Sequence, residues 1–132
     1  MEPNGLVTAA LVATGGAAGA LARYWITVLL TRPGVRFPYG TLVCNAGGCL
    51  AIGAIMWCAI HRPGLPPGVR LAVVVGLLGS LTTFSTFGYE TIELAREGHG
   101  AQAVWNVLAN VALGLTAAAL GMWAASMAAP AR

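Results

Sequence analysis

Long apolar stretches separated by short polar segments dominate this chain of 132 residues. Residues 6–22 carry no charge, and the same apolar run continues past Arg23 to Thr31. Three more runs, 39–60, 71–89 and 101–131, contain no formally charged side chain. About 20 apolar residues in a helix cross a hydrocarbon core of about 30 Å. The pattern therefore predicts four transmembrane helices in one domain, 1–132, at about 5–31, 38–60, 70–95 and 101–128.

The composition agrees with this pattern, because 58% of the residues are hydrophobic and only 8% are charged. A soluble domain has roughly a quarter charged residues, so we expect an all-α membrane protein. Its net charge of +3 is too small and too scattered for nucleic-acid binding. The chain starts MEPNGL, with Glu2 in place of a basic segment, and we expect no cleaved signal peptide.

The connecting segments are short and contain Pro and Gly: TRPGVRFP, HRPGLPPGVR and AREGHG. Such connections predict that consecutive helices are antiparallel neighbours and that both termini lie on one side. Orientation follows an excess of arginine in cytoplasmic loops, but here the two sides balance. Arg62, Arg70 and Arg132 fall on the side of the termini, and Arg32, Arg36 and Arg96 on the other. The balance predicts insertion in both orientations and an antiparallel dimer; the alternative is that a few arginines lie on the other side than this count places them, or that a weak bias suffices.

Small residues on three of the helices predict close helix packing, which in lipid depends on close backbone approach. They are Gly15 and Gly19, then Gly47, Gly48 and Gly53, and finally Gly114 and Ala118. The three cysteines, Cys44, Cys49 and Cys58, have neither disulfide nor zinc spacing, and we expect them to be small buried residues.

Polar side chains inside the second and fourth helices are candidates for a lined path, since polar groups at membrane depth are costly unless buried in protein. Thr41 and Asn45 share one helical face, and so do Asn106 and Asn110. For Asn45 the alternative is an ordinary interhelical hydrogen bond. Two amides stacked one turn apart in the fourth helix favour a path.

The third helix contains GSLTTFSTFGYE, residues 79–90. Gly76 and Gly79 weaken the helix, and the following hydroxyls compete for backbone hydrogen bonds. These features predict a break near 79–83, where free carbonyls can bind a cation. Phe84 and Phe87 share a face; packing is the alternative role, but ring edges among hydroxyls and amides suit a small anion.

Two charged residues belong to the same region. Arg23 can extend to the membrane interface from the first helix, and Glu90 ends the third uncharged run. Either is structural, or the two form an ion pair or a charged vestibule. His61 and His99 are expected in loops as solvated residues, and the sequence contains no catalytic triad or metal-ligand pattern, so we predict no enzymatic activity.

Three segments resemble, in order and spacing, the Fluc (CrcB-type) fluoride channels of microbes: GGAAGALARYW, PYGTLVCNAGGCLAIG and GLLGSLTTFSTFGYET. The resemblance extends from the first predicted helix to the fourth. Its most specific part is G-x-x-G-x-x-T-T-F-S-T-F-x-x-E, from Gly76 to Glu90.

The resemblance implies an antiparallel, dual-topology homodimer in the cell membrane, with two passive fluoride pores along the subunit interface. Asn45, Phe84 and Phe87 would line each pore. A structural Na⁺ at the dimer centre would be bound by the backbone carbonyls of Gly79 and Thr82. The residues implied in or near the path are Thr41, Ser85, Thr86 and Glu90, with Arg23 supporting the central architecture.

One departure concerns the fourth helix, where many relatives have Tyr and Ser at the places of Asn106 and Asn110. The polar character is kept while its chemistry changes.

Two other classes of function are alternatives to a channel. A proton-coupled antiporter like the small multidrug resistance transporters needs a carboxylate in the first helix, where this chain has Arg23. A scaffold subunit would not require amides on packed interior faces.

Overall fold

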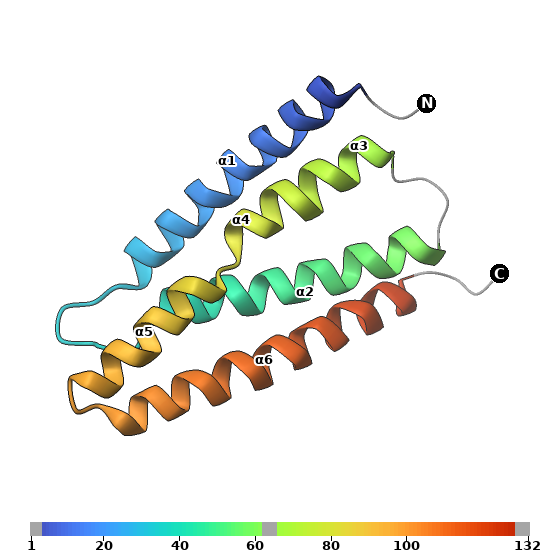
Figure 1. Cartoon of the computed structure of the whole chain (residues 1–132). Coiled ribbons are helices and arrows are strands. Elements are labelled where there is room, and N and C mark those ends of the chain that lie inside the picture. The colour runs from blue at the N-terminus through green and yellow to red at the C-terminus, as the bar shows by residue number, and fades with distance from the viewer. Residues whose placement is uncertain (1–3, 62–65, 129–132) are drawn as a thin grey trace.

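The computed structural model describes residues 4–61 and 66–128, and all the regular structure within them is helical. The elements are α1 (Gly5–Leu30), α2 (Tyr39–His61), α3 (Pro67–Arg70), the π-helical η1 (Leu71–Leu78), α4 (Gly79–Leu81), α5 (Phe84–Arg96) and α6 (Gly100–Met127) (Figure 1). Four spans are long and apolar enough to cross a membrane: Gly5–Leu30, Tyr39–His61, Pro67–Arg96 and Gly100–Met127. The prediction of an all-helical, four-span membrane protein is confirmed.

The beginning of α1 and the end of α6 lie at the same end of the bundle (Figure 1). Glu2, Arg62 and Arg132 lie outside the described residues. The prediction of dual insertion used two of these arginines, and it stays a prediction.

Spans that are not consecutive in the chain make the closest packing. The main contacts of α1 are with η1, and those of α2 are with α6. Figure 1 shows each of these pairs side by side. Consecutive spans are neighbours as well, as expected, since α1 touches α2 and α5 packs on α6.

Glycine explains why these pairs prevail, because a Cβ would not fit at the contact positions. A Cβ on Gly15 would meet the carbonyl oxygen of Ala72, and one on Gly19 that of Leu77. Between α2 and α6, a Cβ on Gly53 would meet the carbonyl oxygen of Ala118. The predicted close packing is confirmed at these sites, and it joins helices of one chain. At Gly47, nothing described lies within 4 Å of such a Cβ.

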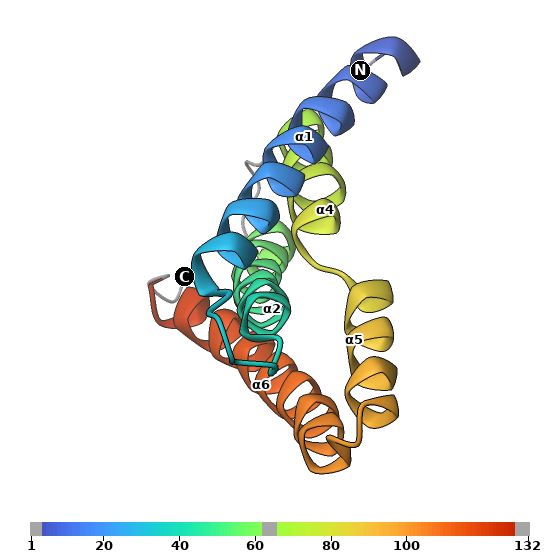
Figure 2. The same ribbon diagram turned by 90° about the vertical axis from the view of Figure 1, so that its left-hand side faces the viewer.

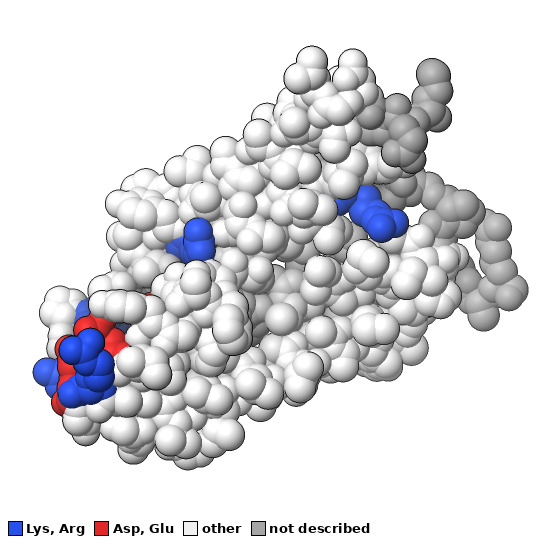
Figure 3. Space-filling view, in the orientation of Figure 1, with Lys and Arg blue, Asp and Glu red and all other residues white. Residues whose placement is uncertain are grey.

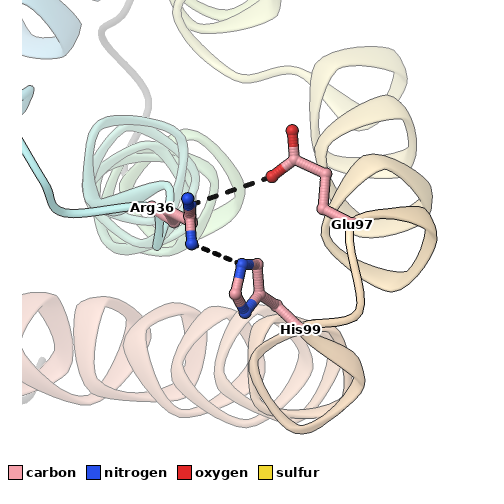
Figure 4. A network of polar contacts seen from close by, with 3 residues as sticks. All are labelled: Arg36, Glu97 and His99. Carbon is pink, nitrogen blue, oxygen red and sulfur yellow. Dashed lines mark hydrogen bonds and ion pairs between the residues drawn. The ribbon is translucent and has the colours of Figure 1, made fainter.

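Charged side chains are sparse on the face shown in Figure 3, and acidic ones gather at one end of the bundle. There Arg36 Nε lies 3.9 Å from Glu97 Oε2, and its Nη1 lies 2.6 Å from His99 Nε2 (Figure 4). His99 is thus a partner of Arg36 rather than only a solvated residue. The loop expectation is wrong for His61, which ends α2 and stacks on Trp57 with 4.5 Å between ring centroids.

Replacing Gly53 by Ala should lower the free energy of unfolding by about 1–3 kcal/mol, the usual cost of overpacking. The added methyl would separate α2 from the Ala118 carbonyl. Thermal unfolding of the detergent-solubilised protein, followed by circular dichroism, measures the change. Gly100→Ala is the control, since no described atom lies within 4 Å of a Cβ there. Equal midpoints for both variants would contradict the packing of α2 on α6.

Candidate functional site

The third span is interrupted at Thr82 and Thr83. Both residues are extended, with φ −82° and ψ 151° for Thr82 and φ −152° and ψ 116° for Thr83. Their hydroxyls bond to nearby backbone groups: Thr82 Oγ1 donates to the Leu78 carbonyl at 2.9 Å, and Thr83 Oγ1 accepts the N–H of Thr86 at 3.2 Å. Thr83 is therefore the N-cap of α5, a position that threonine favours.

The side chain of Asn45 on α2 satisfies the backbone at this break. Its Oδ1 accepts the N–H of Thr83 at 2.8 Å, and its Nδ2 donates to the carbonyl of Thr83 at 3.3 Å. The same Nδ2 donates to Asn110 Oδ1 at 2.9 Å. The interhelical hydrogen bond considered for Asn45 is present, and it holds irregular backbone that would be costly to leave unpaired in a membrane.

The break also changes which carbonyls are available. In an unbroken helix, the N–H of Thr83 would donate to Gly79 and that of Thr86 to Thr82. Here these two N–H groups donate to Asn45 Oδ1 and to Thr83 Oγ1. Among the described residues, the carbonyls of Gly79 and Thr82 accept no hydrogen bond. Backbone carbonyls are hard oxygen ligands, so these two residues fit a Na⁺ site.

The amides of α6 continue the polar set away from Asn45. Asn110 Nδ2 donates to the side-chain oxygen and to the backbone carbonyl of Asn106, both at 3.0 Å. Asn106 is fully buried, and its Nδ2 donates to Thr91 Oγ1 at 2.8 Å. The predicted ladder of Asn106 and Asn110 is thus hydrogen-bonded within one chain. Sequence reasoning missed Thr91, whose signal is its position one helical turn after Phe87.

A cavity of about 420 Å³ lies beside the break. Asn45, Asn110, Phe84 and Phe87 line it together with Gly79 and Thr82, and none of its described lining residues is charged. The two phenylalanine rings are tilted by 54° with centroids 5.5 Å apart. Phe84 is 84% exposed, so this ring is not packed in the core of its own chain.

Two further expected site residues, Ser85 and Thr86, lie directly after the break. Ser85 Oγ is 3.3 Å and Thr86 Oγ1 3.0 Å from Thr83 Oγ1, in the first turn of α5. Neither residue lines the described cavity. These hydroxyls support the N-cap.

Thr41 and Glu90 form a separate group. Thr41 Oγ1 donates to Glu90 Oε1 at 2.9 Å, while Glu90 Oε2 is buried without a hydrogen-bond partner among the described residues. Both line a smaller cavity of about 190 Å³ that also includes Arg36. Arg23 is half-buried and forms no ion pair with Glu90 in the described part of the chain. The hydrogen bond between Thr41 and Glu90 was not predicted from the sequence, which considered Arg23 as the partner of Glu90.

Comparison with known proteins gives one family. Residues 10–122 match the family described as "CrcB-like protein, Camphor Resistance (CrcB)". A relative from Solibacter usitatus (strain Ellin6076) is 47% identical over 112 residues, which cover 84% of this chain and 92% of the relative. One from Acidobacterium capsulatum is 46% identical over 112 residues, 84% of this chain and 90% of the relative. Both relatives are named "Fluoride-specific ion channel FluC".

Replacing Thr83 by Ala should lower the free energy of unfolding by about 0.5–2 kcal/mol, because the N-cap acceptor of α5 is lost. Thr83→Ser keeps a hydroxyl and should stay near the wild-type value. Thermal unfolding in detergent compares the two variants. Equal loss in both would show that the hydroxyl does not cap α5.

Proposed function

The chain belongs to the CrcB-like family, and from this premise we propose that it is a channel that lets fluoride cross the cell membrane passively. The proposal is supported by the curated relatives, which are named fluoride-specific ion channels, and by four spans able to cross a membrane. Because the cell interior is electrically negative, passive flow carries an anion outward, so the channel would relieve fluoride toxicity. No catalytic step is involved.

The observation that carries the proposal is the cavity at the break, which is mostly apolar and has a few neutral polar groups in its lining. Fluoride is small and strongly hydrated, so a pore has to replace its water with hydrogen-bond donors and still release it. Amides, hydroxyls and the positive edges of aromatic rings can do so without a fixed positive charge that would retain the anion. Asn45, Asn110, Phe84 and Phe87 bring such groups to one cavity.

We assign Asn45 the central contact with the anion. Both of its N–H groups are occupied, and the bond to the Thr83 carbonyl, at 3.3 Å, is longer than the bond to Asn110, at 2.9 Å. An arriving fluoride therefore displaces the longer bond and accepts that N–H. The ring edges of Phe84 and Phe87 then continue the path past the break, and Ser85 and Thr86 supply hydroxyls near it.

The other polar residues serve the approach and the walls of the path. Thr41 and Glu90, joined by their hydrogen bond, form the polar entrance next to the smaller cavity. Asn110 contributes the wall from α6, with Asn106 one turn behind it. Arg23, half-buried on α1, supports the centre of the assembly.

We propose that the working form is an antiparallel homodimer with a pore on each side of the interface. A single chain leaves Phe84 in the cavity lining largely exposed, and backbone carbonyls at a break cannot face lipid without cost. A second copy of the chain would cover them. The balance of arginines between the two sides supports opposite orientations of the two copies.

The carbonyls of Gly79 and Thr82 would hold a structural Na⁺ at the centre of this dimer. Both have lost their helical donors at the break. A bound cation compensates their partial negative charge and links the two copies. The protein contributes only main-chain oxygen there, which suits a hard monovalent ion.

An antiporter of the small multidrug resistance type is not favoured. Such a transporter depends on a carboxylate in its first span, and α1 contains neither Asp nor Glu.

Fluoride loaded into liposomes with the purified protein should leave without a proton gradient, while chloride should stay. A fluoride electrode follows the efflux. Phe84→Ile and Phe87→Ile should each slow it about tenfold or more, since about 1.4 kcal/mol on the barrier is tenfold in rate. Trp123→Ile, an aromatic-to-aliphatic change on an exposed residue of α6, is the control.

Strict dependence of the efflux on proton exchange would contradict a channel. Wild-type efflux in both phenylalanine variants would remove the rings from the conduction path.

Replacing Na⁺ in the buffer by a large organic cation should reduce the fraction of dimer, because repulsion between the free carbonyls would no longer be compensated. Size-exclusion chromatography with light scattering measures this fraction, and restoring Na⁺ should reverse the change. An unchanged dimer fraction and an unchanged fluoride flux would contradict a structural cation at Gly79 and Thr82.

A further inference from the structure

A continuous series of hydrogen bonds, called the hydrogen-bonded chain below, starts at Thr83 in the break and ends at Phe87 on α5. The N–H of Thr83 donates to Asn45 Oδ1 at 2.8 Å, and Asn45 Nδ2 donates to Asn110 Oδ1 at 2.9 Å. Asn110 Nδ2 donates to Asn106 Oδ1 at 3.0 Å. Asn106 Nδ2 then donates to Thr91 Oγ1 at 2.8 Å, and Thr91 Oγ1 donates to the carbonyl of Phe87 at 2.7 Å.

The direction of this chain is fixed by its backbone ends. A main-chain N–H can only donate and a main-chain carbonyl can only accept, whereas each asparagine amide offers one donor group and one acceptor oxygen. If Asn110 were turned over, two donor groups would face each other toward Asn45 and two acceptor oxygens toward Asn106. Turning over Asn45 or Asn106 would likewise place two donor groups face to face, toward the Thr83 N–H or toward Asn110. Only one orientation of all three satisfies every member.

The chain connects three elements around the two aromatic rings. It leaves the break at Thr83, crosses α2 at Asn45, passes along α6 and returns to α5 at Thr91. Its last bond reaches the backbone of Phe87 itself. Phe84 and Phe87 therefore belong to a turn whose position is set from both ends by α2 and α6.

We propose that Thr91 is a positioning residue for conduction. This proposal rests on the proposed fluoride path. Its hydroxyl closes the chain between Asn106 and Phe87, and so it holds the asparagine amides and the phenylalanine rings in register with one another. Thr91 does not line the described cavity, so it acts through these residues and does not contact the ion. The fully buried Asn106 transmits the constraint between helices.

The test compares Thr91→Val, which keeps the shape and removes the hydroxyl, with Thr91→Ser, which keeps the hydroxyl. Thr14→Val is the matched control, because Thr14 donates to the carbonyl of Ala10 at 2.9 Å in the same way but lies exposed on α1. Fluoride efflux from liposomes and hydrogen–deuterium exchange of the segment 82–90 are measured on all three variants and on the wild type.

We expect Thr91→Val to slow efflux about tenfold and to speed exchange in the segment 82–90 by about tenfold, as for loss of one interaction in a connected network. Thr91→Ser and Thr14→Val should remain within about twofold of wild type in both measurements. Wild-type efflux and exchange in Thr91→Val would overturn the proposal, and so would equal defects in the Val and Ser variants.

Two further outcomes also decide whether the proposal for Thr91 stands. If the wild type conducts no fluoride, the proposed function fails, and only the exchange measurement tests the hydrogen-bonded chain. Faster exchange in Thr91→Val but not in Thr91→Ser supports that chain, and equal exchange in the two variants overturns it. If Thr91→Val yields no folded protein, the amide of Thr83 in the wild type decides. Slow exchange of this amide, as in the middle of α6, supports the hydrogen-bonded chain, and exchange as fast as that of unpaired loop amides overturns it.

Discussion

The hydrogen bonds between the Asn45 side chain and the backbone of Thr83 are the constraint on which the rest of this structure depends. A helix interrupted inside a membrane leaves backbone groups that lipid cannot satisfy. One amide on α2 supplies both an acceptor for the Thr83 N–H and a donor for its carbonyl. Because Asn45 takes the N–H of Thr83, the carbonyl of Gly79 loses its helical donor. The same residue therefore stabilises the break and creates the free oxygen proposed to bind a cation.

The break also determines how the four spans can pack. In its first half the third span lies against α1, where glycines allow the two backbones to touch, and in its second half it lies against α6 (Figure 2). A straight helix of this length would stay with one partner. The two extended residues Thr82 and Thr83 shift the direction of the chain between these partners. As a result, the rings of α5 are brought beside the amides of α2 and α6.

The chemistry of the proposed path follows from this arrangement. The residues that line its cavity at the break are uncharged, and the amides among them are already hydrogen-bonded within the chain, so an arriving anion exchanges one bond for another and does not bind to an unsatisfied donor. Such an exchange keeps the energy of entry and exit small, as conduction requires. The long bond of Asn45 to the Thr83 carbonyl is the one most easily exchanged. A deeply buried arginine or lysine at the same place would hold the anion more strongly and slow its release.

The sequence by itself determined the four apolar spans, the interruption in the third and the identity of the polar residues inside them, because hydropathy, glycine and hydroxyl content are local properties. Tertiary structure alone decided the pairing of α1 with η1 and of α2 with α6, since close approach depends on which glycine faces which carbonyl. It also separated Thr41 and Glu90 from the cavity of Asn45, and it connected Thr91 to Asn106 across two helices. Helical spacing shows which residues of one helix share a face, but a hydrogen bond between helices also depends on their rotation and depth, which packing sets.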